Sequence, residues 1–209
     1  MQRGKVLNLS KLRFTTFLVE NKILIIALFS LLVGIIFGTV MFDRYEKLNS
    51  FTADYLEKFI ILRTDGTFIK IFLNSFFNSA VVLLIIMIFG TSMFGVVTVP
   101  LTTAVLGIFY GSVTAYLYSQ FALKGIAFNA VIFLPSSIIF IIILMFACRE
   151  SVKFSFKISY LTVSQTVSCN LSLEFKRFLI MFLIFLCGSV LSALTDATVS
   201  HAFIKYFEF

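Results

Sequence analysis

Charged residues are scarce in this sequence, making up only 13% of 209 residues. A soluble globular domain carries about 25% charged residues and is about 45–50% apolar. This chain is 60% hydrophobic, with a mean hydropathy of +1.05, and a soluble fold of its size would expose much of that surface to water. The composition therefore excludes a soluble fold, a disordered chain, a disulfide-rich secreted domain and a nucleic-acid module. It predicts an integral membrane protein.

Residues that carry chemistry are scarce as well. His201 is the only histidine, so neither a histidine-based metal cluster nor a histidine triad can be assembled. Cys148, Cys169 and Cys187 are not placed for an extracellular bridge, and we expect all three to be reduced. No phosphate-binding loop, zinc-protease motif or serine-hydrolase motif is found. The sequence predicts no catalytic residue, no cofactor and no metal.

Ionisable residues are also absent from the interior of the expected spans. We place Asp196 at the membrane interface rather than in the buried interior. Intramembrane enzymes and ion-coupled transporters normally carry ionisable groups at membrane depth, so both classes are disfavoured.

The charges that are present fall in islands separated by long apolar stretches. A bilayer core about 30 Å thick needs about 20 apolar residues as helix, and the longest charge-free stretch, 71–123, is long enough for two spans. Glycines and a proline within 90–100 favour a break there. The predicted transmembrane helices are 23–42, 71–94, 98–120, 125–148 and 178–197. The expected fold is thus all-α, a single polytopic helical membrane domain with about five transmembrane helices.

The distribution of lysine and arginine predicts the orientation in the membrane. With the N terminus inside, the basic segment 1–22 and the loop 149–177 hold ten of these residues, and the outer segments hold seven. Positive charge is enriched on the cytoplasmic side, so we expect the N terminus to be cytoplasmic and the C terminus to lie outside. The net charge of +7 fits contact with membrane lipid. The stretch 149–177 is either a cytoplasmic loop or a helical extension of the fourth span.

The extracytoplasmic segment 43–70 is expected to form an amphipathic helix capped by Asn49 or Ser50 and ended by a turn at 64–66. Its apolar residues recur at helical spacing, and they are Phe51, Tyr55, Phe59 and Leu62. Either this stripe packs on the outer ends of the spans or it docks a partner. In the first case the charged face of Asp54, Glu57 and Lys58 is the candidate partner surface.

Two Gly-xxx-Gly patterns occur in the spans, Gly34 with Gly38 and Gly107 with Gly111. Such patterns let two helix backbones approach closely. The contact lies either within one protomer or between protomers, which leaves a homo-oligomer open.

Three further polar or helix-breaking residues stand out in the spans. Asn74 and Asn78 lie four residues apart, so both amides face one side of the second span. They either form interhelical hydrogen bonds or line a polar conduit. Pro135 is expected to kink the fourth span, with the following serines, Ser136 and Ser137, bonding the freed carbonyls.

The order of these features resembles the stage II sporulation protein M (SpoIIM-like) family. The features are a basic start, an Asn-containing entry to the second span at 71–79, a glycine-punctuated hairpin at 89–112, a proline-bearing span at 133–137 and a closing stretch at 191–201. Two residues depart from the family pattern: Asp196 stands where glutamate is more usual, and His201 stands where proline is common.

The resemblance implies a non-enzymatic membrane scaffold. Such a scaffold would anchor and localise extracytoplasmic peptidoglycan-degrading partners, that is cell-wall hydrolases, during sporulation engulfment. The alternative is the transmembrane subunit of an ABC-type exporter for peptides or bacteriocins. In that case a cytoplasmic ABC ATPase would contact the loop 149–177.

Overall fold

The computed structural model describes residues 22–42, 44–163 and 171–206, and these ranges contain helices and short connections but no strand. The all-α prediction is confirmed. The α-helices are α2 (Lys22–Phe42), α3 (Glu46–Asp65), α4 (Phe68–Gly90), α5 (Gly95–Phe128), α6 (Leu134–Val163) and α7 (Leu171–Phe203). A π-helix, η1 (Asn129–Phe133), joins α5 to α6, and a 3-10 turn, η2 (Ile204–Tyr206), follows α7. The predicted basic segment before α2 lies outside the described residues, apart from Lys22.

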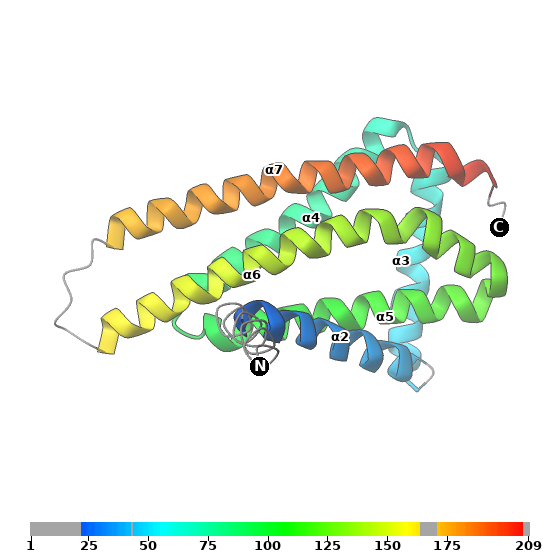
Figure 1. The fold of residues 1–209 in the computed structure, drawn as a ribbon. Coiled ribbons are helices and arrows are strands. Elements are labelled where there is room, and N and C mark those ends of the chain that lie inside the picture. The colour runs from blue at the N-terminus through cyan, green and yellow to red at the C-terminus, as the bar shows by residue number, and fades with distance from the viewer. Residues whose placement is uncertain (1–21, 43, 164–170, 207–209) are drawn as a thin grey trace, which may run out of the picture.

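Five of the α-helices run along a common direction, and α3 lies across one end of them (Figure 1). The α2 helix packs mainly on α5, whereas α4 packs on α7 and α6. Large apolar side chains cover the outer surface of the bundle; Phe29, Phe77 and Leu183 are each more than 60% exposed. Such a surface suits contact with lipid rather than water, so the molecule is a polytopic membrane protein.

Four helical segments in the described chain are long and apolar enough to cross a membrane: Lys22–Phe42, Phe68–Gly90, Gly95–Leu161 and Ser172–Tyr206. The third is a continuous helical run of 67 residues that reverses direction at Ala122, where φ is 45° and ψ is −123°. Beyond that residue α6 returns alongside α5 (Figure 1). The short connection expected between the third and fourth predicted spans is therefore a single sharp reversal. The number of five spans stays a prediction.

The reversal depends on a glycine three residues further on. A Cβ placed on Gly125 would lie 1.9 Å from the carbonyl oxygen of Leu117. Only a residue without a Cβ can come so close to the backbone of the preceding helix.

The chain turns between α4 and α5 at 91–94, within the predicted break, but Pro100 lies inside α5. Of the two alternatives for 149–177, the structure shows a helical extension of the fourth span, because α6 continues to Val163. Its hydroxyl groups explain the continuation: Ser151 donates to the carbonyl of Ile86 at 3.2 Å, and Ser155 donates to that of Ser92 at 2.6 Å. Residues 164–170, Cys169 among them, lie outside the described part of the chain.

The π-helix η1 ends two residues before Pro135. Proline cannot donate a backbone hydrogen bond, and its ring crowds the carbonyl four residues earlier. A wider π-turn relieves such crowding. Ser136 Oγ donates to the carbonyl of Phe133 at 3.2 Å, which is not the carbonyl that the missing N–H of Pro135 leaves free. The irregularity lies before the proline, where α5 passes into α6 within the continuous helical run.

The two Gly-xxx-Gly patterns meet each other where α2 packs on α5. A Cβ on Gly34 would lie 2.2 Å from the carbonyl oxygen of Ala104, and one on Gly107 would lie 2.3 Å from that of Leu31. The second glycine of each pattern, Gly38 and Gly111, is equally close to the opposing backbone, at 2.2 Å. Within this chain the four glycines therefore form one intramolecular helix contact.

Candidate functional site

The transverse helix α3 buries a face that differs from the predicted stripe. Thr52, Leu56, Phe59 and Arg63 are the buried residues, whereas Phe51 is 61% exposed. The prediction that Phe51 belongs to the inward stripe is wrong. It rested on apolar periodicity alone, which cannot show that Arg63 lies on the inward face. The helix begins at Glu46, ahead of the expected caps, and it ends before Gly66, within the predicted turn.

Arg63 forms a buried ion pair with Asp196 of α7, a residue 133 positions away in the chain. The side chains of Arg63 and Asp196 are only 2% and 6% exposed. Arg63 Nε donates to Ser200 Oγ at 3.1 Å, and Nη1 donates to the carbonyl of Phe59 at 3.3 Å. The guanidinium carbon also lies 3.2 Å from the centroid of the Phe59 ring, within the range of a cation–π interaction.

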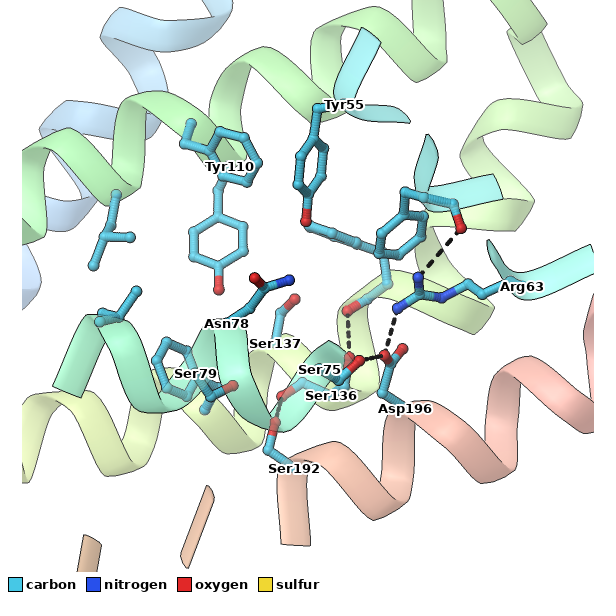
Figure 2. A pocket seen from close by; sticks show the side chains of 16 residues that line it. Tyr55, Arg63, Ser75, Asn78, Ser79, Tyr110, Ser136, Ser137, Ser192 and Asp196 are labelled. Carbon is cyan, nitrogen blue, oxygen red and sulfur yellow. Dashed lines mark hydrogen bonds and ion pairs between the residues drawn. The ribbon is translucent and has the colours of Figure 1, made fainter. Parts of the chain in front are cut away.

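Asp196 is buried inside the protein, whereas the sequence favoured an interfacial position over a buried one. Ser75 of α4 donates to Oδ2, the same oxygen that pairs with Arg63 (Figure 2). Ser200 donates to Oδ1 at 3.4 Å. A buried charge is tolerated only when it is paired and its remaining lone pairs are bonded. Three helices, α3, α4 and α7, satisfy this condition together.

The electrostatics keep Arg63 charged and Tyr55 neutral. Burial lowers the pKa of Arg63, and the carboxylate of Asp196 acts in the opposite direction. Since the pKa of arginine is ordinarily above 12, the guanidinium remains a cation at neutral pH. Burial raises the pKa of the neighbouring Tyr55, although the charge of Arg63 opposes this rise.

A cavity of about 140 Å³ lies next to the ion pair. Arg63 and Asp196 themselves line it, and the rest of its polar lining comes from four serines in α4 and α6, one in α7, two tyrosines and an asparagine. These are Ser75, Ser79, Ser136, Ser137, Ser192, Tyr55, Tyr110 and Asn78 (Figure 2). A water molecule in the liquid occupies about 30 Å³, so the cavity has room for a few waters beside the ion pair.

The sequence spacing places Asn74 and Asn78 on one face of the helix, but only one of them lines the cavity. Asn78 lines the cavity, whereas Asn74 is not among the lining residues. Since α-helical positions four apart differ by about 40°, one amide can face the cavity while the other faces a neighbouring helix.

If the two asparagines form interhelical hydrogen bonds, Asn74→Ala and Asn78→Ala should each lower the free energy of unfolding by about 0.6 kcal/mol, the usual contribution of one such bond in a membrane protein. Unfolding in mixed micelles with increasing denaturing detergent measures this change. If Asn78→Ala abolishes function while folding and abundance stay unchanged, the asparagine acts as part of a polar conduit instead.

The sequence did carry a signal for this site. Ser192, Asp196 and Ser200 recur every four residues, which draws a polar stripe along an otherwise apolar helix. Ser192 Oγ extends the contact to α6, donating to the carbonyl of Ser136 at 2.8 Å. What the sequence could not supply is the cationic partner, because Arg63 lies in a segment assigned to the outside.

The arrangement suits fixation of α3 more than chemistry. The opposite charges of Arg63 and Asp196 neutralise each other, and the residues that the structure covers include no group of three His, Cys, Asp or Glu able to hold a metal ion. Of the cysteines described, Cys148 is buried and Cys187 is exposed, and both are free thiols.

Together the fold and the site define a class: a polytopic helical membrane protein whose transverse helix is held on the spans by a buried ion pair. The family model described as "SpoIIM: Stage II sporulation protein M" matches residues 25–201. The chain belongs to this family, and the matched range includes Arg63 and Asp196. Neither a curated protein nor a solved structure matches the chain significantly.

Proposed function

We propose that this protein is a non-enzymatic membrane scaffold that presents α3 as a docking surface to a soluble extracytoplasmic protein. Since the chain belongs to the SpoIIM family, we propose as the partner a peptidoglycan-degrading enzyme that is localised during sporulation engulfment. One observation carries the proposal: α3 is fixed on the bundle through one face while its opposite face is exposed from Phe51 to Ile61.

The exposed face of α3 mixes charge with large apolar side chains. Asp54, Glu57 and Lys58 are exposed, and Phe51 and Ile61 beside them are 61% and 51% exposed. These positions share one side of the helix because they are spaced three to four residues apart. An apolar anchor at each end, with charges between, is a pattern by which one helix face recognises a partner.

The attachment of α3 makes this surface rigid. Leu56 and Phe59 are buried among residues of α5 and η1, including Leu117 and Ile132. Tyr55 meets the ring of Phe109 edge-on at 4.8 Å. A pre-ordered surface loses less conformational freedom on binding than a mobile loop does, which favours recognition of a partner by α3.

The test is a triple charge reversal, Asp54→Lys, Glu57→Lys and Lys58→Glu. It should weaken co-purification of an extracytoplasmic partner, because charges at a rim steer and orient association. Membrane insertion should be unchanged. The matched control is Lys153→Glu with Lys157→Glu at the opposite end of the bundle, which should leave that co-purification intact.

The second candidate function is the transmembrane subunit of an ABC-type exporter, for which the two sets of charge reversals should have the opposite effects. The observation in its favour is that α6 and α7 extend together at the end remote from α3 (Figure 1), where a cytoplasmic ATPase could dock. If the Lys153 and Lys157 reversals abolish binding of a cytoplasmic ATPase and the α3 reversal changes nothing, the scaffold proposal fails.

A further inference from the structure

A second cavity lies at the end of the bundle remote from α3, between the last part of α6 and the first part of α7. Its volume is about 160 Å³, and its lining residues are Glu150, Lys153, Phe154, Lys157, Glu174, Arg177, Phe178 and Met181. Three cations and two carboxylates converge there, which leaves the lining with a net charge of +1. The ion pair of α3 has no part in this site.

Two ion pairs position the lysines at the rim of this cavity. Lys153 Nζ lies 3.2 Å from Glu150 Oε1, and Lys157 Nζ lies 2.6 Å from Glu174 Oε2. Both lysine side chains remain more than 40% exposed. An ammonium group has three donors, so each lysine can hold its carboxylate and still donate to an incoming anion, next to the guanidinium of Arg177.

An apolar groove meets the charged cavity at Phe154. The groove has a volume of about 410 Å³ and is lined by Thr91, Phe154, Ile158, Ser172 and Phe175. Phe154 stacks on Phe178 with ring centroids 4.4 Å apart, and it also contacts Phe175 at 6.0 Å. One aromatic wall therefore separates a cationic cavity from a hydrophobic groove.

The site lies where the apolar part of each helix gives way to charge. The charge-free part of α6 ends at Cys148, and that of α7 begins at Phe178. Tyr160 and Leu173, which lie beyond these ends on α6 and α7, are 62% and 65% exposed. Exposed aromatic and apolar side chains beside lysine and arginine are typical of the head-group region of a bilayer.

We propose that this composite site binds an anionic phospholipid, with its phosphate on Lys153, Lys157 and Arg177 and an acyl chain in the groove beside Phe154. Basic pockets between transmembrane helices recognise anionic head groups. The adjoining hydrophobic groove distinguishes a lipid from a free phosphate ion, since inorganic phosphate has nothing to place in it.

The experiment uses the full-length protein in detergent, titrated with phosphatidylglycerol or phosphatidylcholine and followed by native mass spectrometry. The wild type should bind phosphatidylglycerol at least tenfold more tightly than phosphatidylcholine. The triple variant Lys153→Gln, Lys157→Gln and Arg177→Gln should lose at least tenfold in affinity, since each cation near an anionic surface contributes about fivefold. A matched variant at the other end, Lys58→Gln, Lys70→Gln and Lys205→Gln, should stay within twofold.

A second variant tests the groove without touching a charge. Ser172→Trp should fill the groove and lower the affinity for phosphatidylglycerol, while leaving any affinity for inorganic phosphate unchanged. Ser172→Trp also tests the lipid-binding proposal if the triple variant fails to fold. Equal affinity for the two lipids, equal losses in both triple variants, or an unchanged Ser172→Trp would overturn the proposal. Displacement of the lipid by millimolar inorganic phosphate would reduce the site to an anion site and overturn it as well.

Discussion

Arg63→Ala is expected to lower the free energy of unfolding by about 3–5 kcal/mol, because it leaves Asp196 buried without a counter-charge. Ser75 and Ser200 would still donate to the carboxylate, but neutral hydroxyl groups cannot replace a cation. Unfolding in mixed micelles measures the loss. The matched control is Lys58→Ala on the same helix, where the side chain is exposed and the change should stay within about 0.5 kcal/mol.

Removing both charges should cost much less than removing one. In Arg63→Met combined with Asp196→Leu, apolar side chains of similar length fill the space, and such replacements of a buried pair are often nearly neutral. The interaction energy from the double-mutant cycle should therefore be large and favourable. Single variants no more harmful than Lys58→Ala would show that the two charges do not hold α3 on the bundle.

Gly34→Ala and Gly107→Ala are expected to destabilise the protein by about 1–3 kcal/mol each, the usual cost of overpacking. The atoms that a new Cβ meets, at 2.2 Å and 2.3 Å, are backbone carbonyl oxygens, so no side-chain rotation can relieve the clash. The α2 and α5 helices would have to move apart along their contact.

Gly188→Ala is the matched control within a span. A Cβ there would meet only the side chain of Ile143, at 3.4 Å, which is close to ordinary van der Waals contact. Alanine is a better helix former than glycine by about 1 kcal/mol, so this change should be neutral or slightly stabilising in the same unfolding assay. Equal losses at all three positions would mean that helix contact at Gly34 and Gly107 is not tight.

Local sequence signals were sufficient for much of the fold. Long charge-free stretches predicted helices of membrane-spanning length, and the all-α fold and the family are confirmed. The closing turn of α3 was also predicted correctly at Gly66, where a Cβ would lie 1.9 Å from the carbonyl oxygen of Leu62.

Signals that depend on distant contacts were insufficient. The pairing of Arg63 with Asp196 joins segments 133 residues apart, and hydropathy treats both charges as markers of a span end. For the same reason the predicted inward face of α3 differs from the observed one, and Phe51 was assigned to the buried side. For the stretch after Cys148 the sequence left a loop and a helical extension open. The bonds of Ser151 and Ser155 to the opposing backbone, which favour the helix, again join distant segments.

The topology of the chain tests the central claim most directly, because a docking surface for an extracytoplasmic protein must lie outside the cell. In a variant with all three native cysteines replaced, a thiol-reactive, membrane-impermeant label should reach Glu57→Cys and Ala202→Cys in intact cells. Ser172→Cys, at the opposite end of the bundle, should react only after permeabilisation. All three positions are exposed, so differences in labelling report the side of the membrane. Labelling of Ser172→Cys in intact cells, with Glu57→Cys protected, would place α3 in the cytoplasm and contradict the scaffold proposal.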